Sequence, residues 1–350
     1  MPWLPLTHPH PSPGQPLDAA LLLEGTALLF PPLPDPQVAA LVTRVDRTSY
    51  DVLTAHGPSR VAPTADPSTV GDWLALAPDG LVVERLPRRS LLVRGSASGS
   101  SNVQPLAANV DTVLVCLGLS GPLPLRRLER LLLLSWDSGA TPVVVLTKAD
   151  LCEDVTAAVR QVRPHAPGVE VVAVSAATGD LTALSPWTSG TLVLLGASGA
   201  GKSTVVNALL GEPVMATGST RHADGKGRHT TTHRELLQLP TGGLVIDTPG
   251  LRGVSLPPVG EQAAAQAFSD VEELFELCRF HDCGHDSEPG CAVQAAVASG
   301  DLEPARLASW RTLQREVAFQ ARRGDARLRA EESRRWKAIT KQNRGRPARR

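Results

Sequence analysis

Residues 191–204 read TLVLLGASGAGKST, and this stretch decides the fold. An apolar run, 192–195, leads into the pattern Gly-x-x-x-x-Gly-Lys-Ser, and an apolar segment of helical character follows at 205–210. A strand, a glycine-rich loop and a helix in this order form the context in which the pattern binds phosphate. We therefore predict a phosphate-binding loop here, and the alternative is a chance match in a turn rich in Gly, Ala and Ser.

The residue types of this loop suit the phosphates of a nucleotide. Glycines let backbone N–H groups curl around phosphate oxygens, and the N-terminus of the following helix adds partial positive charge. Lys202 is expected to reach the β- and γ-phosphates, and Ser203 is expected to bind Mg²⁺. The predicted nucleotide-binding residues of the loop are Gly196, Ala197, Ser198, Gly199, Ala200, Gly201, Lys202, Ser203 and Thr204.

A second phosphate motif lies 45 residues beyond Lys202. The segment Val245-Ile246-Asp247-Thr248-Pro249-Gly250 reads as an apolar strand that ends in Asp-Thr-Pro-Gly. We expect Asp247 to hold Mg²⁺ through water and Gly250 to offer its backbone N–H to the γ-phosphate. Asp-x-x-Gly is a weak signal alone, but its place after a phosphate loop and an apolar strand makes it specific.

Residues upstream of the loop predict the base that the nucleotide carries. Leu146-Thr147-Lys148-Ala149-Asp150 resembles the N/T-K-x-D motif by which GTP-binding proteins read guanine. The Asp150 carboxylate is expected to accept from guanine N1 and N2, a pairing that adenine does not offer, while the Lys148 stem packs over the base. The alternative is that Thr147 or Asp150 merely caps the helix that follows. Ser175 and Ala176 resemble the companion S-A-K/L motif and favour the guanine interpretation.

The order of these motifs predicts a rearranged domain. Apolar strands alternate with helices from Ala107 onward, which indicates a mostly parallel sheet wrapped by helices. In ordinary GTPases the phosphate loop comes first, whereas here the base-reading motifs precede it. We therefore predict a circularly permuted α/β GTPase domain over residues 105–256. Permutation attaches the C-terminal part of the chain directly to the segment that senses the γ-phosphate.

The segment between the loop and Asp247, GSTRHADGKGRHTTTHREL, is expected to be the first switch. Thr230, Thr231 and Thr232 are all candidates to close over Mg²⁺, and we favour Thr231 because of its distance from the next strand. Leu251 stands where many GTPases carry a glutamine that orients water, so another group must do this. His229 is our catalytic candidate, and the alternative is an ordinary exposed loop histidine.

The residues before the predicted GTPase domain form two parts. Residues 1–36 are rich in proline and are expected to be a disordered arm. Residues 37–104 contain short strand candidates at about ten-residue spacing, which fits an OB-type β barrel, although a small sandwich fits nearly as well. Arg85, Arg88, Arg89 and Arg94 are either part of a nucleic-acid surface or a solvated basic loop.

Three cysteines and a histidine within fourteen residues predict a metal site in the C-terminal domain, residues 257–350. The pattern is Cys278-x4-Cys283-x-His285-x5-Cys291, and Cys₃His is an accepted tetrahedral zinc set. His281 and Asp282 are rival ligands, and three reduced cysteines in a polar loop are the alternative. This domain is expected to be mostly helical, with helices at 261–278 and 302–340 and a break at Gly324.

Composition limits the other classes of function. The chain has 350 residues and balanced charge, with 35 Lys and Arg against 35 Asp and Glu, so net charge indicates no partner. Residues 322–350, however, hold twelve Lys and Arg against three Asp and Glu, a net charge of +9 that suits an anionic partner. No long apolar run and no secretory signal are evident, so we expect a cytoplasmic protein without a membrane span.

The ordered set of TKAD, SAA, GASGAGKST, GRHTTTHREL, DTPG, CRFHDCGHDSEPGC and a basic tail resembles the RsgA (YjeQ) family. This resemblance covers residues 38–345. It implies an OB-fold domain, a permuted GTPase domain and a C-terminal zinc domain. It also implies GTP hydrolysis that the small ribosomal subunit stimulates during its late maturation, and a hydrolytic role for His229. Thr147 departs from the commoner asparagine, which puts in doubt a contact that braces the phosphate loop.

The resemblance further implies partners and cofactors. We expect the small ribosomal subunit and its rRNA as partners, GTP and GDP as ligands, one structural zinc ion per chain, Mg²⁺ with GTP, and a monomer. A competing hypothesis is an RNA-binding assembly factor in which GTP only sets the conformation and turnover is incidental. A third is a permuted GTPase of the large subunit, which the position of the zinc motif argues against.

Overall fold

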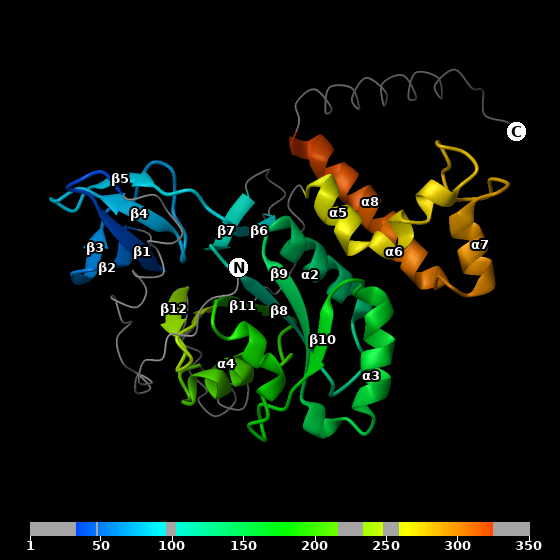
Figure 1. Cartoon of the computed structure of the whole chain (residues 1–350), viewed down its shortest axis with the longest axis horizontal. Coiled ribbons are helices and arrows are strands. Elements are labelled where there is room, and N and C mark those ends of the chain that lie inside the picture. The colour runs from blue at the N-terminus through cyan, green and yellow to red at the C-terminus, as the bar shows by residue number, and fades with distance from the viewer. Residues whose placement is uncertain (1–32, 47, 96–102, 216–233, 248–258, 325–350) are drawn as a thin grey trace, which may run out of the picture. The chain divides into compact units, whose positions relative to one another are not determined.

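The computed structural model describes residues 33–46, 48–95, 103–215, 234–247 and 259–324 (Figure 1). They fall into two compact units. The first is drawn from Met1–Val93 and Pro105–Val254, and the second from Arg94–Gln104 and Ser255–Arg350. Within the described residues, no helix is both long and apolar enough to cross a membrane.

Five short antiparallel strands near the N-terminus form the predicted β barrel, in the order β3-β2-β1-β4-β5. Their alternating apolar residues enclose a small core that includes Val42, Val52 and Leu74. The last strand candidate of the stretch 37–104, at 90–94, does not join them, because it pairs with residues 103–108 in a separate two-stranded sheet. The strands are β1 Val38–Val45, β2 Tyr50–Thr54, β3 Gly57–Val61, β4 Trp73–Leu76, β5 Val82–Arg85, β6 Leu91–Gly95 and β7 Val103–Ala108.

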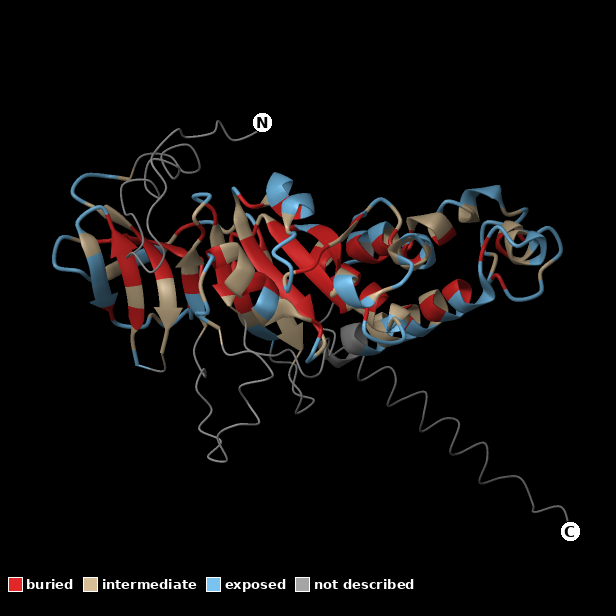
Figure 2. Ribbon diagram, turned by 90° about the horizontal axis from the view of Figure 1, so that it is seen from below, coloured by how far each residue is buried: buried red, intermediate tan, exposed pale blue. Residues whose placement is uncertain are grey.

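A mostly parallel sheet follows in the order β10-β9-β8-β11-β13-β12, and only β12 runs antiparallel to its neighbour β13 among these strands. Its central strands are mostly apolar and are buried over nearly their whole length, because both faces are covered (Figure 2). The sheet therefore confirms the predicted α/β architecture. The strands are β8 Thr112–Gly118, β9 Thr141–Thr147, β10 Glu170–Ala173, β11 Thr191–Gly196, β12 Glu235–Gln238 and β13 Leu244–Asp247.

Helices cover both faces of this sheet. Val113 and Val115 of β8 pack with the residues of α2 Leu125–Asp137 and α3 Val155–Val162, whereas Leu114 and Cys116 pack with α4 Lys202–Leu210. Side chains of a strand alternate between its faces, so the two cores lie on opposite sides. Helices α2 and α3 cover the first face, and α4 covers the second. The loops that carry the motifs lie at the carboxyl edge of the sheet.

The helix that we expected directly after the Thr147–Asp150 motif, over residues 149–162, is not continuous. A single 3₁₀ turn, Ala149–Leu151, is followed by an extended Cys152, and α3 begins only at Val155. Asp154 ends the break because its Oδ1 accepts from the backbone N–H of Ala157 at 2.8 Å, which caps α3. The turn leaves the predicted guanine-reading residues in a loop.

The second unit is mostly helical, as predicted. Arg306 on its longest helix is 1% exposed, contacts Asp270 with two nitrogens and lies over the Phe268 ring at 4.1 Å. A buried arginine needs such partners, so this contact fixes the long helix against the preceding short ones. The helices are α5 Glu261–Ala267, α6 Ser269–Glu272, a 3₁₀ turn Phe275–Leu277, α7 Ala292–Ser299 and α8 Pro304–Gly324. Residues 325–340, which we predicted to continue the last helix, lie outside the described residues.

Candidate functional site

The predicted phosphate loop connects β11 to α4 and has the backbone that its glycines allow. Gly196, Gly199 and Gly201 have φ values of +152°, +82° and +79°. A Cβ on Gly196 would lie 2.5 Å from the Cys116 carbonyl oxygen, and one on Gly201 would lie 3.0 Å from Thr147 Oγ1. The loop therefore requires glycine at these two positions both for its conformation and for its close contact with the neighbouring strands.

Lys202 lies at the first position of α4 and turns back into the loop. Its Nζ donates to the carbonyl oxygens of Gly196 at 3.0 Å and Ala197 at 2.8 Å. Ser203 follows in the first helical turn, next to the exposed N–H groups of the helix N-terminus. The ammonium group and the helix N-terminus thus concentrate positive charge at one point, which is the electrostatic requirement of a phosphate site.

Asp247 ends β13, the strand that pairs with β11. Burial raises the pKa of its carboxyl group to about 6, the positive charge of Lys202 lowers it in part, and Glu235 raises it further. Glu235 lies directly opposite Asp247 on β12. A partly desolvated carboxylate gains from a cation, so Asp247 and the Ser203 hydroxyl are oxygen donors of the kind that Mg²⁺ prefers.

Thr147 at the end of β9 is 2% exposed and contacts the phosphate loop directly. Its Oγ1 donates to the Ala200 carbonyl oxygen at 2.7 Å, and the Leu117 carbonyl oxygen lies at 3.3 Å. From the sequence, threonine in place of asparagine put in doubt a contact that braces the phosphate loop. The Thr147 hydroxyl does contact the phosphate loop, at a residue 53 positions further along the chain.

The two predicted guanine-reading segments lie side by side. Ser175 Oγ donates to Asp150 Oδ1 at 2.6 Å, and the N–H of Ala149 donates to the Val174 carbonyl oxygen at 3.1 Å. Lys148 has the left-handed φ of +60° that turns the chain sharply after β9. The hydrogen bond from Ser175 orients the carboxylate that would read guanine. Ala176 follows Ser175 in the loop after β10.

Several predicted site residues lie outside the described residues. These are the catalytic candidate His229, the switch threonines Thr230, Thr231 and Thr232, and Gly250 with the neighbouring Leu251. Thr204 is described and is exposed on the first turn of α4. The structure thus brings together the phosphate loop, Asp247 and the base-reading residues.

Two residues near this site were not singled out in the sequence. Ser120, after β8, accepts from Lys148 Nζ at 3.2 Å, and Glu235 faces Asp247 across the β12–β13 hairpin. The second position was accessible from sequence, because counting outward from a three-residue turn at Pro240-Thr241-Gly242 pairs residue 235 with residue 247.

The predicted metal ligands lie together in the second unit. The ligand atoms of Cys278, Cys283, His285 and Cys291 all lie within 4.8 Å of one another. His285 Nδ1 is 3.6 Å from Cys278 Sγ and 3.7 Å from Cys291 Sγ. A tetrahedral zinc ion with ordinary bond lengths would place its sulfur and nitrogen ligands about 3.6 Å apart, so these residues fit zinc. His281 and Asp282 are not members of this cluster.

The surroundings of His285 hold it in a ligating position. Its ring stacks on Phe275 with centroids 4.2 Å apart, and its carbonyl oxygen accepts from Gln294 Nε2 at 2.6 Å and from Arg311. Burial lowers the pKa of His285, which favours the neutral imidazole that binds metal. Burial opposes ionisation of Cys278, but the N–H groups of Ala292 and Val293 and the neighbouring thiols outweigh it and lower its pKa.

Arg85, Arg88, Arg89 and Arg94 each contact an acidic or amide side chain. Arg88 contacts both carboxylate oxygens of the buried Asp72 at 2.7 Å. The other pairs are Arg85 with Asp66 at 2.7 Å, Arg89 with Asp111 at 3.1 Å and Arg94 with the Gln104 side chain at 2.8 Å. These contacts give the arginines a structural role.

Comparison with known proteins supports the same interpretation. The family model described as RsgA GTPase matches residues 85–257. The chain is 53% identical to "Small ribosomal subunit biogenesis GTPase RsgA" of Streptomyces avermitilis over 316 residues, which cover 86% of this chain and 85% of the relative. It is 48% identical to the protein of the same name from Opitutus terrae, with coverage of 79% and 80%.

Two solved structures have a similar fold. YjeQ from Thermotoga maritima matches with a TM-score of 0.60 and 25% identity, over 81% of this chain and 99% of that one. YloQ, titled a circularly permuted GTPase, matches with a TM-score of 0.59 and 24% identity, over 82% and 96%. These structures confirm the predicted permuted fold. The family model and the relatives confirm the GTPase activity. The chain belongs to the RsgA family of GTPases.

Proposed function

We propose that this GTPase acts in late maturation of the small ribosomal subunit and that the subunit stimulates its hydrolysis of GTP. The observation that carries the proposal is the contact between the two nucleotide-binding loops. Thr147 connects the guanine-reading loop to the phosphate loop, and Ser175 orients Asp150. The partner follows from the relatives, which are named small ribosomal subunit biogenesis GTPases.

The residues at the site divide the work of binding and hydrolysis. Lys202 and the loop N–H groups bind the β- and γ-phosphates, while Asp150 and Ala176 select guanine. Mg²⁺, held by Ser203, Asp247 through water and Thr231, would neutralise charge that develops on the phosphates. Gly250 offers its N–H to the γ-phosphate, and His229 positions the attacking water in the place of the glutamine that Leu251 replaces.

The metal cluster has a structural role in this proposal. Cys278, Cys283, His285 and Cys291 form a closed set of four protein ligands, which leaves no position for a reacting water if zinc binds them. The segment between the 3₁₀ turn and α7 is short and polar, so metal binding would supply much of its folding free energy. One zinc ion per chain is the expected content.

RNA is the partner that the charge distribution suits. The basic tail at 322–350 carries a net charge of +9, and it is joined through the C-terminal domain to the segment that follows Asp247. Nucleotide state would reach this RNA-binding end along that connection. Since the barrel arginines are paired, the tail and the zinc domain carry more of this proposal than the barrel. We place the protein in the cytoplasm, as a monomer with an N-terminal arm at 1–36, a barrel at 37–104, a GTPase domain at 105–256 and a zinc domain at 257–350.

A second candidate function is an RNA-binding assembly factor that uses GTP only as a conformational switch. Leu251 favours it, because a leucine cannot orient water and intrinsic turnover should therefore be slow. Steady-state GTP hydrolysis, measured alone and with purified small or large subunits, separates the candidates. Stimulation by small subunits supports the enzyme, whereas equal rates in all three samples support the assembly factor.

A further inference from the structure

The β barrel carries a rigid turn, residues Ser68–Asp72, which we name the docking turn. Asp72 fixes it from within, because its Oδ2 accepts from the Thr69 N–H at 2.7 Å and both of its oxygens bind Arg88. The Asp72 carbonyl oxygen also accepts from the N–H of Val42 on β1 at 2.8 Å. The turn is therefore held to the barrel as one body.

The docking turn contacts the strand ends that lead into the GTPase sheet. The Val70 carbonyl oxygen accepts from the Ala108 N–H at 2.9 Å, and the Gly71 carbonyl oxygen accepts from Asn109 Nδ2 at 2.8 Å. Asn109 is 5% exposed and has a left-handed φ of +53°, so its side chain is committed to this contact. The turn and the segment that connects β7 to β8 thus share buried hydrogen bonds, which are costly to break.

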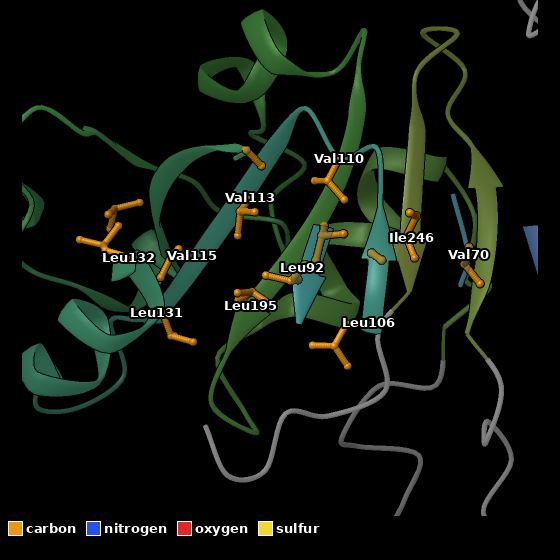
Figure 3. Packing of buried hydrophobic residues seen from close by; sticks show 14 of the residues in the cluster. Val70, Leu92, Leu106, Val110, Val113, Val115, Leu131, Leu132, Leu195 and Ile246 are labelled. Carbon is orange, nitrogen blue, oxygen red and sulfur yellow. The ribbon is translucent and has the colours of Figure 1, made fainter. Parts of the chain in front are cut away.

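Gly71 is the point of closest approach. A Cβ added there would lie 2.2 Å from the Ala108 carbonyl oxygen and 3.1 Å from Ile246 Cδ1. Val70 is fully buried in the same core as Ile246, as Figure 3 shows, and Leu236 belongs to that core as well. Ile246 directly precedes Asp247, and Leu236 directly follows Glu235, so the turn packs beneath the last residues of β13 and the first residues of β12.

The barrel also contacts β12 directly, through backbone pairing with β1. Arg44 on β1 lies opposite Glu235, and Glu235 lies opposite Asp247, so three adjacent strands align there. The first predicted switch, 218–236, ends in β12, and the second, 247–250, begins at the end of β13. The barrel therefore holds both strands at the ends where the switches attach.

We propose that the docking turn is a positioning element of the nucleotide site, which sets the place of Asp247 and thereby how well the site distinguishes GTP from GDP. Packed cores do not deform continuously, so a shift of Gly71 moves Ile246 and the residue after it. The proposal rests on the proposed function, because it requires GTP at the phosphate loop. It adds a second route of control, from the N-terminal barrel, to the one through the C-terminal domain.

Gly71→Ala tests the proposal against a matched control, Gly80→Ala. Both glycines lie in the barrel at positive φ, +89° and +83°, but nothing lies within 4 Å of a Cβ on Gly80. The two variants therefore share backbone strain, and only Gly71→Ala forces the turn away from Ala108 and Ile246. The measurements are Mg²⁺-dependent affinities for fluorescent GTP and GDP analogues and single-turnover hydrolysis of GTP.

The new Cβ must move the turn by roughly 1 Å, and misplacements of that size cost up to about 10²-fold in rate. We expect Gly71→Ala to weaken GTP affinity and slow hydrolysis by about 10- to 100-fold while GDP affinity stays near the wild-type value. Gly80→Ala should behave as wild type in all three measurements. Equal GTP-to-GDP ratios in the two variants overturn the proposal.

A second variant covers the case in which Gly71→Ala does not fold. Asn109→Asp keeps the acceptor for the Arg89 N–H and tolerates the left-handed backbone, but it loses the donor to the Gly71 carbonyl oxygen. It should lower the GTP-to-GDP affinity ratio in the same direction, and an unchanged ratio contradicts the proposal. Failure of the wild-type protein to bind GTP would instead remove the proposed function itself.

Discussion

The hydroxyl of Thr147 offers the sharpest test of how the guanine-reading loop and the phosphate loop are joined. Thr147→Val keeps the shape of the side chain but removes the donor to the Ala200 carbonyl oxygen, which lies at 2.7 Å. Thr147 is 2% exposed, so water cannot replace the lost donor. A buried polar group left unsatisfied costs about 1–3 kcal/mol.

This free energy should appear both in folding and in nucleotide binding. If all of it falls on the loop conformation that binds phosphate, GDP affinity drops by about 5- to 150-fold, because each 1.4 kcal/mol is a factor of ten. Affinity for a fluorescent GDP analogue measures the free energy lost in nucleotide binding. Urea unfolding in the absence of nucleotide measures the free energy lost in folding. Together, the two losses should fall in the range of about 1–3 kcal/mol.

Two control variants make the test specific. Thr147→Ser keeps the hydroxyl and should retain most of the affinity, whereas the exposed Thr182 can be changed to valine as a matched substitution outside the site. The bracing contact has no energetic role if Thr147→Val matches Thr182→Val in both affinity and unfolding free energy.

Three further predictions concern other parts of the molecule. Burial raises the folded-state pKa of Asp247 to about 6, above the value of about 4 in the unfolded chain. Without Mg²⁺, the free energy of unfolding of the wild type should therefore fall relative to that of Asp247→Asn as pH rises from about 4 to about 6. Urea unfolding of both proteins across this pH range measures the difference, and a constant difference contradicts the buried carboxyl group. Cys283→Ser should lower zinc content below one ion per chain by atomic absorption, while Cys152→Ser, outside the cluster, should not; equal contents exclude Cys283 as a ligand. His229→Ala should keep GTP affinity but lose stimulated turnover, and an unchanged rate assigns hydrolysis to another group.

The local motifs were predictable because their chemistry depends on neighbouring residues. The phosphate loop, Asp247 at a strand end and the Cys₃His set each lie in one short segment, so spacing and residue type identify them. The structure places Lys202 against the loop carbonyls and draws the four metal ligands together. The permuted order of the motifs was likewise readable from the sequence alone.

Contacts between distant segments were not predictable. The Thr147 hydroxyl meets Ala200 across 53 residues, and β1 pairs with β12 through Arg44 and Glu235. A short antiparallel pairing of this kind has no local signal, because either partner could satisfy its backbone elsewhere. The role of the barrel arginines depended in the same way on carboxylates outside their own segment, such as Asp111.

The helix boundaries could not be predicted accurately, because local side-chain contacts determine them. Asp154 began a new helix where apolar periodicity indicated a continuous one, because a capping side chain outweighs periodicity over a few residues. The helix α7 is eight residues long and consists mainly of alanine and valine, so it shows no polar face to mark it. Cys291 begins it by accepting from the Gln294 N–H, a capping role hidden behind its predicted metal role.

The most direct test of the account is a nucleotide competition during turnover with small ribosomal subunits present. Labelled GTP is hydrolysed by the purified protein and small subunits while unlabelled GTP, GDP or ATP is added. The account predicts that the subunits raise the rate, that GTP and GDP compete, and that ATP does not compete at the same concentration. Equal competition by ATP, or a rate that small subunits leave unchanged, would contradict it.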